Sequence, residues 1–336
     1  MSDQTPSVQT LSVYAASDFR VSIGANMGDG VSIHDDLAVD DIYLLEPGAT
    51  ARKMAIIAET AGHFRLSIAT EIGTPGAHVH LDCVMTFMTE DGTTQDAIVL
   101  AEVDDAGGLA GVHLLPLAPL DPKVEYRLVG VDRDGVRARF AQFACVYFTR
   151  GTHITMSTGQ QRPVEDLRPG DRVLTRDDGP HEIRWVGHST VRAVGGFAPI
   201  LIEAGALNNA NDLLVSPDHR LFVYQRQDRI GAGQSEILVK ARHLVNGDSV
   251  RVVAGGFVEY YQILFDRHHI IYAEGIAAES MLVDPRTQSV LPAELLAQMG
   301  TNPKGHGRGD RHGLDVQENL LDRPDAVDLL RLSSLR

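Results

Sequence analysis

Short β-rich segments separated by turn residues most strongly constrain the fold of this chain. In the first half they cover Phe19–Ile23, His63–Ala69, His78–Phe87, Ala97–Glu102 and Glu125–Val131. Clusters of glycine and aspartate lie between them, as at residues 90–92 and 132–135. Segments with this spacing are typical of antiparallel β sandwiches and barrels. We therefore expect an all-β, sandwich-like domain over residues 1–145, in which residues 50–61 form either a strand or a helix.

The second half continues this pattern and then changes character. Its β-rich segments are residues 172–175, 182–186, 199–203, 212–215, 220–225, 249–253, 257–265 and 270–273. Farther along, residues 292–299 predict a short helix, residues 300–313 a glycine-rich linker, and residues 316–335 an amphipathic helix interrupted at Pro324. We expect a second β domain over residues 146–282 and a partly helical, partly flexible tail over residues 283–336.

A short repeat lies within this second half. Leu167-Arg-Pro-Gly-Asp-Arg-Val173 follows the pattern L-x-x-G-D-x-V, and Leu244-Val-Asn-Gly-Asp-Ser-Val250 follows it again. In such a pattern the glycine ends a helical turn with a positive φ angle, and the valine begins a strand. Two copies indicate a duplicated fold with pseudo-twofold halves, although two unrelated turns of one kind would give the same pattern.

Charge and cysteine content exclude several kinds of protein. Lys and Arg total 30 and Asp and Glu total 45, which gives a net charge of −15. A chain this acidic is poorly suited to nucleic acid, which binds basic patches. The two cysteines, Cys83 and Cys145, exclude a disulfide framework and any four-cysteine metal site. Since no H-x-x-x-H or H-E-x-x-H spacing occurs, we expect no metal and no cofactor, although a zinc site assembled by folding stays open.

The hydropathy of the chain predicts no membrane span. No apolar run approaches the roughly 18 residues that a transmembrane helix needs. The first ten residues, MSDQTPSVQT, lack the basic segment and apolar stretch of a secretory signal peptide. This leaves two locations open, the cytoplasm and export by another route.

Four stretches of the second half carry a family resemblance: Phe148–Asp177, Ile183–Gly187, Asp212–Arg220 and Asp266–Ser280. In their residues and their order they resemble the Hint module shared by hedgehog autoprocessing domains and inteins. Bacterial Hint-domain proteins of unknown role resemble the chain most. The resemblance implies an all-β, horseshoe-like fold with pseudo-twofold halves, in agreement with the repeat described above.

The resemblance also implies a chemistry and shows where this sequence departs from it. A Hint module attacks its own upstream peptide bond with a cysteine at its first position, in an N-to-S acyl shift. Tyr147 occupies that position here, and the nearest thiol, Cys145, lies two residues upstream. A phenol, with a reference pKa of about 10, is a poor nucleophile for an amide. Inteins finish with His-Asn, and Glu279-Ser280 replaces that pair, which excludes splicing by asparagine cyclisation.

The resemblance carries over a set of candidate catalytic residues: Tyr147, Cys145, Thr152, Ser216, His219, Asp266, His268 and His269. His219 corresponds to the histidine that hydrogen-bonds the scissile amide, and Ser216 to the threonine of the same motif. Each residue also has a structural interpretation. His219 can be a core histidine, Ser216 a turn residue, Cys145 a buried apolar residue, and residues 266–269 a polar turn between strands.

Two functions follow from these features. The first is a Hint-domain protein whose self-cleavage is impaired or lost and which acts as a two-domain structural or binding protein. The alternative is active self-cleavage that releases the N-terminal domain, which would be its intramolecular substrate. A hydrolase acting on other molecules is a weaker third possibility, because no G-x-S-x-G motif occurs.

Overall fold

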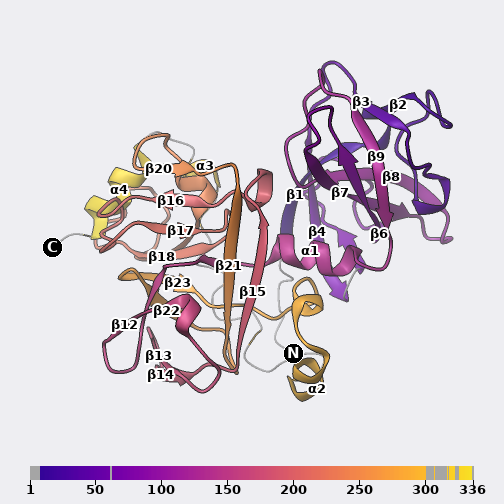
Figure 1. Cartoon of the computed structure of the whole chain (residues 1–336). Coiled ribbons are helices and arrows are strands. Elements are labelled where there is room, and N and C mark those ends of the chain that lie inside the picture. The colour runs from indigo at the N-terminus through magenta and orange to yellow at the C-terminus, as the bar shows by residue number, and fades with distance from the viewer. Residues whose placement is uncertain are drawn as a thin grey trace. The chain divides into compact units, whose positions relative to one another are not determined.

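The computed structural model describes residues 8–60, 63–299, 306, 316, 318–321 and 325–334. The chain forms two compact units (Figure 1). The first comprises Met1–Phe143 and Pro285–Val290, and the second comprises Ala144–Asp284 and Leu291–Arg336. Strands dominate both units, which confirms the all-β fold class.

One nine-stranded antiparallel sheet forms the first unit. Its strands are β1 (Val8–Ala15), β2 (Phe19–Ile23), β3 (Ile42–Leu45), β4 (Arg52–Thr60), β5 (His63–Leu66), β6 (His78–Met88), β7 (Thr94–Val103), β8 (Leu109–Pro116) and β9 (Tyr126–Asp132). Their order is β2-β3-β9-β6-β5-β4-β1-β8-β7. Because β6 also pairs with β7, part of the sheet closes on itself, and the unit is barrel-like.

The segment that the sequence left open between strand and helix is strand β4. It pairs with β1 on one side and with β5 on the other. Met54, Ala55 and Ile56 are consecutive and all buried, so both faces of this strand are covered. A strand covered on both faces has a continuous apolar sequence instead of an alternating one, and such a run also suits a helix.

Helix α1 (Val136–Ala144) joins the two units and was not predicted. The polar cluster before it contains a turn in which the Gly135 N–H donates to Asp132 Oδ1 at 2.9 Å. Phe140 is buried on the helix, and its ring centroid lies 5.1 Å from that of Phe64. The helix ends one residue before Cys145.

Two antiparallel sheets form the second unit. The six-stranded sheet has the order β15-β21-β10-β17-β16-β20, with β10 (Phe148–Thr149), β15 (Trp185–Arg192), β16 (Ile200–Ile202), β17 (Leu213–Val215), β20 (Val250–Val252) and β21 (Phe257–Leu264). The eight-stranded sheet contains β11 (His153–Thr155), β12 (Gln161–Pro163), β13 (Arg172–Thr175), β14 (Gly179–Glu182), β18 (Arg220–Tyr224), β19 (Glu236–Lys240), β22 (Ile270–Ala273) and β23 (Ile276–Glu279). Strands of both sheets contribute to one apolar core, for example Ile154, Val215 and Ile263.

The prediction of a single strand over residues 182–186 is wrong, because the chain passes from the eight-stranded sheet to the six-stranded sheet there. The Ile183 N–H donates to Asp171 O, and the Arg184 N–H donates to Leu264 O. Strand β14 therefore ends in one sheet, and β15 begins in the other. Figure 1 shows β15 running alongside β21 as a long two-stranded ribbon.

Both copies of the repeat adopt the same local structure. Each consists of a short 3₁₀ helix, η3 (Val164–Asp166) or η5 (Ala241–Leu244), then a glycine, then a strand. The φ angle is 94° at Gly170 and 77° at Gly247, as the pattern predicts. Since the copies lead into different sheets, through β13 and β20, the pseudo-twofold relation of complete halves stays a prediction.

The tail contains α2 (Ala293–Met299), α3 (Glu318–Leu321) and α4 (Ala326–Ser334). The helix expected over residues 292–299 is confirmed, whereas the glycine-rich segment lies, except for His306, outside the described residues, as does Pro324. Leu321, Val327 and Leu330 join the core of the second unit. In the part of the chain that the structure describes, no helix is both long and apolar enough to cross a membrane.

Candidate functional site

Strand β10 places Tyr147 beside Ser216. Phe148 pairs with Val215 of β17 and with Tyr261 of β21, so the residue before it lies next to the segment that follows β17. Two hydrogen bonds connect the segments. The Tyr147 N–H donates to Ser216 Oγ at 3.0 Å, and the Ser216 N–H donates to the Tyr147 carbonyl at 3.1 Å. The backbone of Tyr147 is therefore held at both its N–H and its carbonyl group.

His219 completes this group from the turn that begins at Ser216. Its N–H donates to Ser216 O at 3.0 Å, which closes the turn. Its Nδ1 lies 2.9 Å from Tyr147 O, and its Nε2 lies 3.0 Å from Glu279 O. The His219 residue is 0% exposed, and its ring centroid lies 4.5 Å from that of Phe148.

The two carbonyl oxygens beside the His219 ring determine how many hydrogen bonds each protonation state of the ring can donate. Burial lowers the pKa of His219, against the opposing effects of the Tyr147 carbonyl and the Glu279 charge. A neutral imidazole carries one N–H, so it donates to one of the two carbonyls at a time, whereas an imidazolium ion donates to both. The site thus contains a neutral histidine next to the backbone of residue 147, with a second carbonyl in position for a second proton.

The side chain of Tyr147 is packed as an aromatic core residue. Tyr147 is buried, and its ring centroid lies 4.9 Å from that of Tyr260. The Tyr260 hydroxyl donates to Phe197 O at 2.9 Å, and burial raises the pKa of Tyr260. This environment fixes the Tyr147 ring against a second, neutral phenol.

A buried ion pair between Arg220 and Glu279 lies next to His219. The sequence did not predict this pair. Strands β18 and β23 pair Leu221 with Ala278, and the next step of this register places Arg220 opposite Glu279. Arg220 Nε lies 2.8 Å from Glu279 Oε2, and the two side chains are 7% and 3% exposed. His268 Nε2 lies 3.6 Å from the other carboxylate oxygen. Glu279 therefore contacts His219 through its backbone and Arg220 and His268 through its side chain.

The remaining predicted residues have other partners. Asp266 forms a bidentate ion pair with Arg184, at 2.6 and 2.7 Å. The His269 N–H donates to Ser280 Oγ at 3.0 Å, and the Ser280 N–H donates to His269 O at 2.9 Å. The His269 ring contacts Asp178 and His181.

Two further candidates lie on either side of β10. The Thr152 N–H donates to Thr149 O at 3.2 Å in the turn after the strand. Cys145 lies before the strand and is buried, and neither Cys145 nor Cys83 forms a disulfide. Of the predicted set, the structure thus brings Tyr147, Ser216 and His219 together, and links His268 to them through Glu279.

The depressed pKa of His219 predicts that acid destabilises the second unit. Below its reference pKa of 6.5 the unfolded chain protonates this histidine while the folded chain keeps it neutral. The contribution of His219 to the free energy of unfolding is therefore constant above that pH and falls below it, by up to about 1.4 kcal/mol per pH unit. We expect His219→Gln to remove this contribution to the slope below about pH 6.5.

Fluorescence of the single tryptophan provides the measurement. Trp185 lies on β15, so its signal in urea titrations at a series of pH values reports the second unit. Buried His306, whose pKa is also lowered by desolvation, contributes equally to wild type and variant. Identical slopes for the two proteins would contradict a neutral His219.

Comparisons with known proteins found one matching family model and several similar solved structures. Residues 146–285 match the family model described as the Hint domain. Similar solved structures include a bacterial intein-like domain from Clostridium thermocellum (14% identity, 40% of this chain and 97% of that chain, TM-score 0.30). They also include the gp41-1 intein (12% identity, 40% of this chain and 97% of that chain, TM-score 0.26). A third is the MchDnaB-1 intein (15% identity, 40% of this chain and 98% of that chain, TM-score 0.27). No curated protein matches the chain.

Proposed function

We propose, for a chain whose residues 146–285 form a Hint domain, that the framework for amide activation is retained but cleavage before Tyr147 is impaired or lost. In this proposal the Hint domain is a structural or binding domain that stays joined to the N-terminal β domain. The observation that carries it is the buried Tyr147 ring, packed on Tyr260. In the family resemblance, Tyr147 corresponds to the cysteine that attacks the peptide bond.

The groups around residue 147 support this interpretation. Acyl transfer needs a nucleophile at the Val146 carbonyl carbon and a proton for the amide nitrogen of residue 147. Ser216 Oγ lies 3.0 Å from that nitrogen, and His219 Nδ1 lies 2.9 Å from the carbonyl oxygen of the same residue. Two groups able to exchange protons thus flank residue 147, whereas its own side chain is a phenol, which attacks amides poorly.

Cys145 is poorly placed to act as the nucleophile of an active cleavage. An N-to-S shift on Cys145 would break the bond to Ala144, the last residue of helix α1. The contacts of Ser216 and His219 are to Tyr147, and two residues of extended chain span about 6.6 Å. The polar groups are therefore grouped around a different peptide bond.

The test is the intact mass of the full chain, tagged at both ends and purified with and without added thiol. We expect one full-length species in both samples. Two fragments whose junction lies at residue 145 or 147 would contradict the proposal and identify the nucleophile.

Cys145→Ala provides a separate prediction. We expect the same single species as for the wild type after hydroxylamine treatment, and a cost to stability of about 1 kcal/mol, usual for a point substitution. Cys83→Ala, which removes the other buried thiol, is the matched control. A hydroxylamine-sensitive fragment present in the wild type and in Cys83→Ala, but absent from Cys145→Ala, would assign the cleavage to Cys145.

A further inference from the structure

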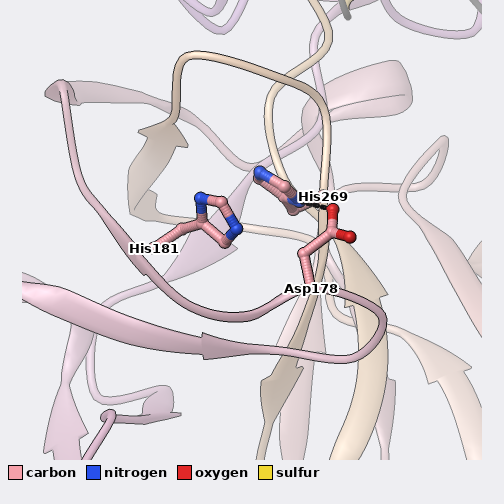
Figure 2. A group of neighbouring side chains, drawn as sticks. All are labelled: Asp178, His181 and His269. Carbon is pink, nitrogen blue, oxygen red and sulfur yellow. Dashed lines mark ion pairs between the residues drawn. The ribbon is translucent and has the colours of Figure 1, made fainter.

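We propose that Asp178, His181 and His269 form a binding site for a divalent transition-metal ion of the zinc class. Figure 2 shows the three side chains together, with the ion pair between Asp178 and His269 drawn as a dashed line. Their ligand atoms all lie within 4.8 Å of one another. This group is separate from the one around Tyr147 and His219, and the inference does not depend on the proposed function.

The pairing of two hairpins brings the three residues together. Asp178 lies in the turn between β13 and β14, where its N–H donates to Thr175 Oγ1 at 3.3 Å, and His181 lies on β14. Strand β13 also pairs with β22, through Thr175 and Ile271, and His269 immediately precedes β22. All three positions are thus set by strand pairing within one sheet.

The distances are close to those of a metal site. Nδ1 of His269 lies 3.5 Å from Oδ2 of Asp178. Ligand atoms on a tetrahedral zinc ion with bonds of about 2.0–2.2 Å lie roughly 3.3–3.6 Å apart. This pair already has that separation. The third ligand atom needs to approach by about an ångström, a movement within the reach of side-chain rotation.

The two histidine rings lie close enough together to bind one ion. Their centroids lie 4.1 Å apart, with an angle of 30° between the ring planes. A neutral imidazole nitrogen is the form that binds a metal.

Of the three metal-binding side chains, His269 is held firmly by its surroundings, whereas Asp178 and His181 are accessible to an ion from solvent. His269 is buried, and its backbone is fixed by Ser280, whose Oγ accepts from the His269 N–H at 3.0 Å. Asp178 is exposed and His181 is half-buried, so an ion has a path to the site and water can fill the remaining coordination position.

Two nearby polar side chains are already engaged elsewhere. Asp266 is bound by Arg184. His306 lies with Nε2 3.1 Å from Phe265 O, and its Nδ1 accepts from the Val283 N–H. The ligand set is therefore two imidazoles and one carboxylate. This combination suits zinc and neighbouring transition metals, whereas magnesium and calcium prefer oxygen ligands.

The test uses untagged full-length protein that has been treated with EDTA and then passed into metal-free buffer. We expect titration with ZnCl₂, followed by calorimetry, to give one ion per chain, and CoCl₂ to give the visible absorption of four-coordinate cobalt. MgCl₂ should give neither signal. His181→Ala and Asp178→Asn should each weaken zinc binding at least tenfold.

Two other histidines serve as matched controls. His63 and His80 form a second close pair, with their Nδ1 atoms 2.6 Å apart, and His188 pairs with Glu259 at 3.5 Å. We expect His63→Ala and His188→Ala to bind zinc as the wild type does. Urea titration followed by Trp185 fluorescence in EDTA establishes that the second unit, which contains the proposed metal site, folds in each variant. Since Asp178 lies in an exposed turn, Asp178→Asn keeps the test valid if His181→Ala does not fold. Absence of saturable zinc binding, unchanged affinity in folded Asp178→Asn, or loss of binding in His63→Ala would overturn the proposal.

Discussion

Tyr147→Cys is expected to make the chain cleave itself between Val146 and residue 147. In the acyl shift the new thiolate attacks the Val146 carbonyl carbon, so that a C–S bond forms, the C–N bond breaks, and the amide nitrogen gains a proton. The hydrogen bonds of Ser216 and His219 to residue 147 involve its backbone N–H and carbonyl groups, so both contacts survive the substitution. Removal of the ring also makes room for the transition state beside Tyr260.

The measurement is intact mass after incubation with dithiothreitol or hydroxylamine, which release a thioester. Tyr147→Phe keeps the ring and should stay intact. In the double variant Tyr147→Cys/His219→Ala, cleavage should be slower by about 10²–10⁴-fold, the usual contribution of a positioned acid or base. If Tyr147→Cys folds but stays intact in both reagents, the loss of activity extends beyond the nucleophile, to the positions of Ser216 and His219.

The sequence predicted strands best where the whole segment belongs to one sheet. The bounds of β2, β13 and β22 coincide with those expected from their apolar patterns. The prediction failed between Glu182 and Trp185, where backbone hydrogen bonds to Asp171 and Leu264 divide an unbroken pattern between two sheets. Apolar periodicity records which residues are buried, but it does not record which strand pairs with them.

The same distinction applies to the candidate sites. Ser216 and His219 could be identified because one short motif contains both, and the structure places them at Tyr147. Asp178 and His181 carry no such motif and reach His269 only through the pairing of β13 with β22. The proposed metal site therefore has no characteristic spacing in the sequence, which left open only that a zinc site could be assembled by folding.

The Arg220–Glu279 pair is expected to give the largest stability effect in the second unit. Glu279→Gln removes the negative charge but keeps the size of the side chain, and so takes the carboxylate of Glu279 away from the buried guanidinium of Arg220. Breaking a buried pair in this way costs about 3–5 kcal/mol of unfolding free energy. Arg251 provides the matched surface control, since it pairs with Glu203 at 3.2 Å with side chains 46% and 47% exposed. Arg251→Ala should cost less than about 1 kcal/mol.

A double variant separates the charge effect from loss of packing. Arg220→Met/Glu279→Leu removes both charges and fills similar volume, so it should be more stable than Arg220→Met or Glu279→Leu alone, because neither buried charge remains without the other. Urea titration followed by Trp185 fluorescence measures the wild type and all of these variants, since this residue lies on β15 in the same unit. Equal, small losses for Glu279→Gln and Arg251→Ala would mean that water reaches the buried pair. Burial, which lowers the pKa of His219, is kept in every variant, and loss of the Glu279 charge removes an effect that opposes it. The acid sensitivity of His219 should therefore persist even where stability falls.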